Sequence, residues 1–119
     1  MRASYRDSEA YHLARHLLVD AYASGSVVES RAGFSDRLNR TVLSLTMGIV
    51  DGSSCEDANQ RRHHLEASLR ATGELADVIQ RCRAEGEIPS AVAEKMLDLR
   101  ERVADSLRST LADVTDPTR

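Results

Sequence analysis

Apolar residues recur every three or four positions along most of this 119-residue chain. This is the period of a helix that buries one face, and no stretch shows the alternation of a half-buried strand. Four such segments can be drawn, at residues 8–24, 35–51, 54–85 and 90–114. Short connections join them, so the pattern predicts an all-α fold: a single up-down-up-down antiparallel four-helix bundle that spans residues 1–119.

Capping residues and glycines set the expected ends of these helices. The expected N-caps are Asp7 or Ser8, Ser35, Ser53 or Ser54, and Ser90. The expected stops are Gly25, Gly52 and Gly86, with Pro89 before the last helix. Residues 25–34 are expected to form a loop, and Pro117 is expected to lie in a frayed tail.

The second predicted helix is apolar on most of its circumference. One stripe consists of Leu38, Val42, Leu45 and Ile49, and a second, on another side, of Leu43, Met47 and Val50. A helix that is apolar nearly all round must be covered nearly all round, whereas each helix of a small bundle normally keeps one solvated face. The pattern therefore predicts that Leu43, Met47 and Val50 contact another copy of the chain.

The other two long helices have one stripe each. The third carries Leu65, Leu69, Thr72, Leu75, Ile79 and Cys82, and the fourth Val92, Met96, Leu99, Val103, Leu107, Leu111 and Val114. Aromatic residues make up only 3% of the chain and Trp is absent. The core is therefore expected to be aliphatic, which suits close helix packing.

The charge balance argues against a general nucleic-acid binder, because the formal net charge is -3 and such proteins usually carry a basic excess. One local group of basic residues keeps the alternative open: Arg37, Arg40, Arg61, Arg62 and His64. Repeated around an oligomer, these side chains would make a weak phosphate-binding face. A solvated helix surface is the favoured interpretation.

The sequence indicates no chemistry of a recognisable kind. It holds two cysteines without metal-site spacing and no catalytic motif, so we expect no enzyme activity and no cofactor. His12 and His16 lie one turn apart, but no nearby carboxylate completes a metal site. No signal peptide and no membrane-spanning run is recognised, so we expect a protein of the cytoplasm.

A resemblance to a known family rests mainly on residues 38–52, where Leu38, Arg40, Ser44, Ile49 and Gly52 match its signature and Asp51 replaces a glutamate. Thr46 stands where proline is frequent, and Gly48 stands where the family has asparagine. Further matches are Tyr11, Leu65, Ala67, Glu74 and Leu75. The segment resembles a bacterial four-helix bundle family encoded by intervening sequences in ribosomal RNA genes. Accessory variability proteins of diversity-generating retroelements are related to it.

The resemblance implies a ring-shaped homopentamer and a structural or scaffold role without an assigned molecular function. The alternative is a nucleic-acid-binding accessory protein that uses a repeated arginine face. Among the polar residues of the pattern, Arg40 needs a carboxylate partner if it is buried. Glu74 is the candidate, and the pair is expected to fix helix register.

Overall fold

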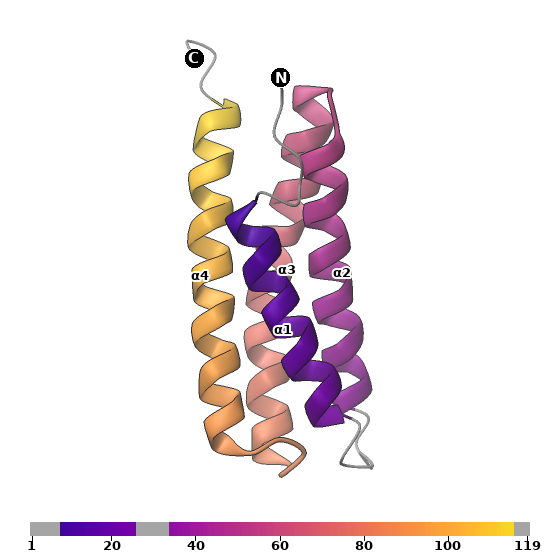
Figure 1. Ribbon diagram of the computed structural model, residues 1–119, viewed down its shortest axis with the longest axis vertical. Helices are drawn as coiled ribbons and strands as arrows, with labels where there is room; N and C mark the ends of the chain where they lie inside the picture. The colour runs from indigo at the N-terminus through magenta and orange to yellow at the C-terminus, as the bar shows by residue number, and fades with distance from the viewer. Residues whose placement is uncertain (1–7, 26–33, 116–119) are drawn as a thin grey trace.

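The computed structural model describes residues 8–25 and 34–115, with side chains described for residues 8–21 and 36–113. These residues form four helices and no strand: α1 (Glu9–Gly25), α2 (Phe34–Ser54), α3 (Ala58–Ala84) and α4 (Ser90–Thr115). The helices run alternately up and down in a rod (Figure 1) that measures 49 × 19 × 18 Å. The predicted all-α four-helix bundle is confirmed.

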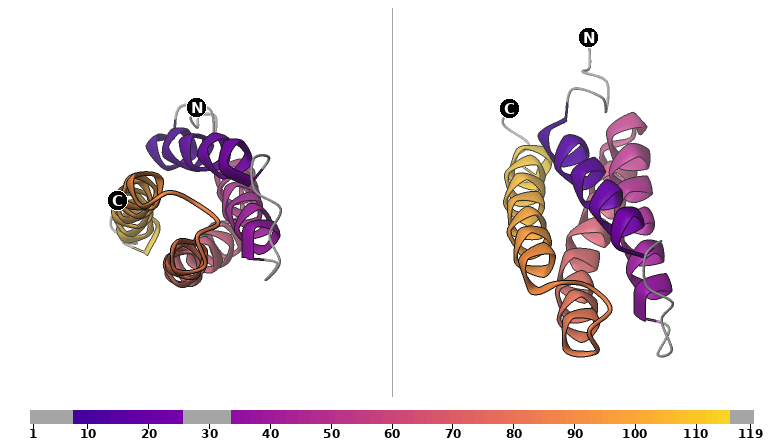
Figure 2. Two further views of the ribbon diagram at one scale, coloured as in Figure 1. Left: turned by 90° about the horizontal axis from the view of Figure 1, so that it is seen from below. Right: turned by 60° about the horizontal axis from the view of Figure 1, so that its bottom comes forward.

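Each helix packs against two neighbours, so the contacts form a closed ring: α1 with α2, α2 with α3, α3 with α4, and α4 with α1. Seen from below, the four helices surround a common centre, and α1 crosses the others at an angle (Figure 2). α1 has 17 residues and α3 has 27, which correspond to about 25 and 40 Å. α1 therefore covers only part of the length of the rod.

The predicted stripes supply the buried core. The fully buried large side chains are Leu17, Leu38, Val42, Leu45, Ile49, Leu75, Val78, Ile79, Cys82, Met96, Val103 and Leu107. Three expected core residues depart from this, because Leu69, Val92 and Leu111 are only partly buried. Ser68, the neighbour of Leu69, is 3% exposed instead. A small side chain lies at the centre of the contact between α2 and α3 because the two backbones come close together there.

The start of α1 is as expected, since the backbone N–H of Tyr11 donates to Ser8 Oγ at 3.3 Å. Asp7, the other expected cap, lies outside the described residues. α2 begins at Phe34, one residue before its expected cap. Ser90 is not the cap of α4 but lies in its first turn, because the N–H of Ala93 donates to the Pro89 carbonyl oxygen at 3.0 Å.

The boundary between α2 and α3 was predicted at the wrong residues. α2 continues through Gly52 to Ser54, and α3 starts at Ala58. The N-cap of α3 is Asp57, whose carboxylate accepts from the N–H of Asn59 at 3.1 Å. The expected caps Ser53 and Ser54 belong to the last turn of α2.

Gly52 is a packing residue and not a helix stop. A Cβ atom at this position would lie 2.8 Å from Leu65 Cδ2 and 3.3 Å from His64 Cβ. One turn earlier, a Cβ at Gly48 would collide with Ser68 Oγ. That hydroxyl instead donates to the Leu45 carbonyl oxygen at 3.4 Å. The two glycines thus let α2 approach α3 closely.

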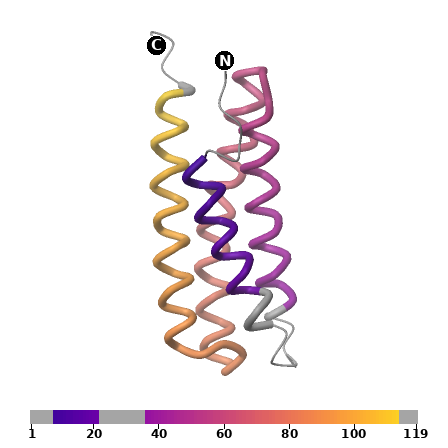
Figure 3. Tube along the Cα trace, in the orientation of Figure 1, coloured from indigo at the N-terminus to yellow at the C-terminus, as the bar shows by residue number. Residues whose placement is uncertain are grey.

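The end of α3 confirms the expected stop at Gly86. This glycine has φ +73°, a conformation that side chains with a Cβ disfavour. The N–H of Glu87 donates to the Cys82 carbonyl at 2.8 Å, and that of Gly86 to the Arg83 carbonyl at 3.1 Å. This is the paired bonding of a Schellman motif. It turns the chain directly into the short connection to α4 (Figure 3). Of the other expected irregular segments, residues 26–33 and Pro117 lie outside the described residues.

Two glycine substitutions test the close approach of α2 and α3. Gly52→Ala should lower the free energy of unfolding by about 1 kcal/mol or more, because Leu65 must move. Gly73→Ala is the matched control on α3, since no atom lies within 4 Å of its added Cβ. This control should raise the free energy of unfolding by about 0.5–1 kcal/mol. Urea unfolding measures both, and a stabilised Gly52→Ala variant would contradict the packing role.

Candidate interaction surface

The side of α2 that faces away from the bundle carries exposed apolar side chains. Leu43 is 41% exposed and Met47 is 51% exposed. Val50, the third predicted interface residue, is only partly buried and lies at the edge of this side. Arg40, Ser44 and Asp51 are exposed around them. We call Arg40, Leu43, Ser44, Met47 and Asp51 the outer face of α2.

A shallow groove runs beside this face, between α2 and α3. One part has a volume of about 250 Å³ and is lined by Ser44, Met47, Gly48, Asp51, His64, Ala67, Ser68 and Ala71. A second part of about 330 Å³ is lined by Arg37, Arg40, Thr41, Ser44, Ala71 and Glu74. Ser44 and Ala71 line both parts, so the groove is continuous. Its floor is made of small side chains, and its charged residues lie towards the two ends.

The predicted ion pair between Arg40 and Glu74 is wrong. Arg40 Nε lies 3.1 Å from Asp36 Oδ2, and the partner of Glu74 is Arg37, at 3.6 Å. Three helix positions separate the two arginines, and although both border the groove, Arg37 is the one that reaches Glu74 on α3. Arg37 and Glu74 are about half exposed, at 46% and 55%. The pair can help to set helix register, but such pairs add at most about 1 kcal/mol.

The candidate nucleic-acid contacts do not form one basic patch. Arg62 lies 3.7 Å from Glu66. Arg61 donates to the carbonyl oxygens of Cys55 and Glu56, at 3.1 and 3.2 Å. It thereby holds the α2–α3 connection and is not free for a phosphate. His64 is partly buried in the wall of the groove.

The two groups of arginines also lie near opposite ends of α2. Arg37 and Arg40 are near the start of α2, whereas Arg61 contacts the chain just after its end, at Cys55. The 15 residues from Arg40 to Cys55 correspond to roughly 22 Å of helix. The idea that Arg37 and Arg40 join the cluster at Arg61 and Arg62 is therefore wrong.

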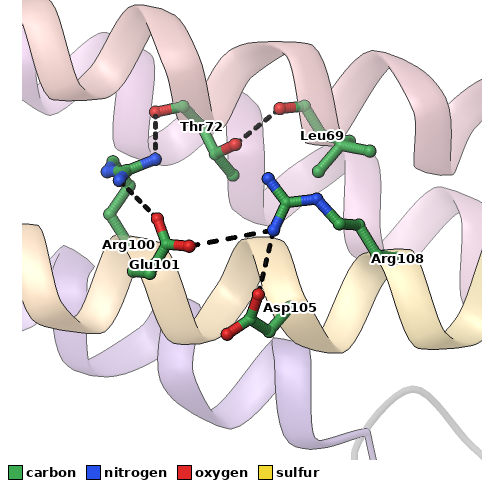
Figure 4. A network of polar contacts seen from close by, with 6 residues as sticks. All are labelled: Leu69, Thr72, Arg100, Glu101, Asp105 and Arg108. Carbon is green, nitrogen blue, oxygen red and sulfur yellow. Dashed lines mark hydrogen bonds and ion pairs between the residues drawn. The ribbon is translucent and has the colours of Figure 1, made fainter.

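A polar network between α3 and α4 escaped the sequence analysis (Figure 4). Arg100, whose side chain is 18% exposed, donates to the Thr72 carbonyl oxygen at 3.4 Å and to Glu101 at 2.7 Å. Arg108 lies 3.8 Å from Glu101 and 2.9 Å from Asp105. Arg100 thus bridges two helices on the side away from the outer face of α2. Only the three-dimensional arrangement identifies it, because charged residues surround it in the sequence.

The two histidines on α1 lie beside a hollow of about 310 Å³ between α1 and α4, lined by His12, Arg15, His16, Val19, Asp20 and Lys95. Lys95 Nζ lies 3.4 Å from Asp20 Oδ2, so the nearest carboxylate pairs with a cation. Within the described residues, no group of three or more His, Cys, Asp and Glu side chains could hold a metal ion.

Cys82 is the one thiol enclosed by the core. It is fully buried, and burial, with a smaller contribution from the negative charge of Glu87, raises the pKa of Cys82 to about 11. A nucleophilic cysteine needs a lowered pKa and access to a substrate. Cys82 has neither and is a packing residue.

No helix in the described residues combines the length and apolarity that a bilayer crossing requires.

No protein-family model and no curated protein sequence matches the chain.

The raised pKa of Cys82 predicts a loss of stability in alkali. The unfolded thiol loses its proton near its ordinary pKa of 9.0, whereas the folded thiol keeps it until about 11. The unfolded state therefore binds fewer protons between these values, and stability falls as the pH rises through them, by up to about 3 kcal/mol. Urea unfolding from roughly pH 8 upwards, where thiol ionisation begins, measures the slope. A Cys82→Ala variant should have a shallower slope, and equal slopes would contradict the assignment.

The pairing of the arginines predicts that RNA and DNA are not retained at about 0.15 M salt. A filter-binding titration of the parent at that salt and at lower salt measures this. An Arg61→Glu/Arg62→Glu variant is the control. If nucleic acid is retained by the parent but not by the double variant, then Arg61 and Arg62 do form a phosphate-binding site, and the prediction is wrong.

Proposed function

We propose that this protein is a non-enzymatic, homo-oligomeric scaffold whose subunits meet through the outer face of α2. The observation that carries the proposal is the exposure of Leu43 and Met47, one turn apart, on a helix whose opposite side already forms the core. Neither side chain is needed for the core of a single subunit, because the stripe from Leu38 to Ile49 supplies the contribution of α2 to that core.

Burial of these side chains supplies a driving force. Complete burial of a Leu or Met side chain is worth about 1.5–3 kcal/mol. Leu43 and Met47 are roughly half exposed, so each has about half of that still to gain. The groove beside them has a floor of Ser, Gly and Ala side chains, which allows a neighbouring helix to come close.

The chemistry of the described surface supports a scaffold over an enzyme. The two parts of the groove are shallow, and their arginines are paired with Asp36 and Glu74. Acid–base catalysis depends on groups with shifted pKa values inside a pocket. The one large upward shift concerns Cys82, which is enclosed in the core.

The resemblance supports self-association and implies five subunits in a ring. A ring needs two different patches on each subunit, so that the outer face of α2 would meet another surface of its neighbour. The mass of the assembly in solution gives the subunit number. A single-chain mass of 13.1 kDa would contradict the proposal.

A pair of matched variants tests the surface. Met47→Glu should reduce the oligomer to monomers without unfolding the bundle, because it places a charge in the centre of the contact. Val19→Glu is the control, since Val19 is even more exposed, at 62%, but lies on α1. Light scattering gives the mass and circular dichroism the helix content. The proposal is wrong if Met47→Glu keeps the parent mass, or if Val19→Glu alone dissociates the oligomer.

A further inference from the structure

The outer side of α2 carries a line of four residues that another helix could meet along its length. Arg40, Ser44, Met47 and Asp51 are separated by four, three and four positions, the spacing of a seam between two packed helices. All four are exposed. The seam borders the groove, because Ser44, Met47 and Asp51 also line the part of the groove with a volume of about 250 Å³.

The charges at the two ends of this seam are opposite. Arg40 lies at one end and Asp51 at the other, equally far from the midpoint between Ser44 and Met47. A two-fold axis at this midpoint would set two copies of α2 antiparallel. Arg40 of each copy would then lie opposite Asp51 of the partner subunit, and Ser44 opposite Met47 of the partner subunit. A large side chain would thus meet a small one at the centre.

Among the described residues, none forms an ion pair with Asp51 that would balance its charge. Asp51 also lies in the last turn of α2, which holds no basic residue. The C-terminus of a helix carries partial negative charge, so an acidic residue there is unfavourable. A cation supplied by a second helix would pair with the carboxylate of Asp51 and offset the partial negative charge of the helix end.

Arg40 can supply that cation without losing its present contact. Its partner Asp36 lies on the same helix, and both side chains are more than 70% exposed, at 72% and 73%. Pairs of this kind contribute about 0.3–0.5 kcal/mol, so a rearrangement costs little. A guanidinium has five N–H donors and can hold two carboxylates at once.

The neighbouring helix favours the same arrangement. Beside the seam, α3 presents Ala67, which is exposed, and Ala71, which is partly buried, to the groove. Small side chains let α2 and α3 of a second copy lie alongside without a clash. Contact through α2 alone would be a strip of roughly 30 × 10 Å, small compared with the roughly 800 Å² per partner that stable interfaces bury. A stable contact therefore requires the flank of α3 as well.

We infer that the outer face of α2 binds a second copy of itself in antiparallel orientation, held in register by two symmetric Arg40–Asp51 ion pairs. The inference rests on the proposed self-association and gives it an orientation. A two-fold contact of this kind joins two subunits and cannot extend to a third, because both copies of the face are used. It differs from the ring of five that the resemblance implies.

Cysteine cross-linking tests the orientation in the full chain. In a Cys55→Ser background, the only remaining thiol is the buried Cys82. Arg40→Cys and Asp51→Cys are added singly and together, and a short bis-maleimide is applied. Within one chain the two positions lie roughly 16 Å apart along α2, too far for a short linker. The double variant lacks both ion pairs, so the reagent is applied at a protein concentration at which light scattering shows that variant to be a dimer. It should then give a covalent dimer on a denaturing gel, and the single variants should stay monomeric.

Light scattering of the parent distinguishes failure of the inference from failure of the proposed function. A dimer mass with cross-linking of the double variant alone supports both. A larger oligomer, or a dimer in which the double variant does not cross-link or a single variant does, overturns the antiparallel contact and leaves the scaffold standing. A monomeric parent overturns both.

Charge reversal tests the two ion pairs directly. Arg40→Glu and Asp51→Arg should each raise the dissociation constant about tenfold or more. The combined variant restores opposite charges across the axis and should return to within about threefold of the parent. The opposite result, in which the combined variant is as weak as the worse single variant, would remove these pairs from the contact.

Discussion

The close approach of α2 and α3 is the constraint on which the rest of the structure depends. At Gly48 and Gly52, a single added carbon atom on α2 would meet Ser68 or Leu65. This tight seam places Leu38, Val42, Leu45 and Ile49 inside the bundle. The opposite side of α2 is thereby directed outwards, with Leu43 and Met47 on it. The same short distance makes the groove beside the outer face shallow and lines its floor with small side chains.

Periodicity identified the helices and most of the core because burial acts on each helix separately. A stripe at helical spacing must face the interior wherever the other helices lie. Gly52 was misinterpreted for a physical reason: the lack of a side chain suits both a helix end and a tight contact. Only the position of Leu65 distinguishes the two roles.

The misassigned ion pair shows a second limit. Arg37 and Arg40 differ by three positions, and which of them faces Glu74 depends on the rotation of α2 about its axis. The sequence carries no information on a rotation of that size. The bridging role of Arg100 was hidden for the same reason, since its acceptor is the backbone oxygen of Thr72 on another helix. The exposed apolar stripe was predictable because it lies within one helix.

The closed ring of helix contacts has a consequence for how the molecule opens. Contacts between α2 and α3 and between α3 and α4 join neighbours in sequence, but those of α1 with α4 join the two ends of the described chain. Closing so long a loop carries the largest entropic cost of the four contacts. α1 is also the shortest helix. Its detachment would leave α2 packed on α3 and α3 packed on α4, so amide hydrogens along α1 should exchange with solvent before those of the other helices.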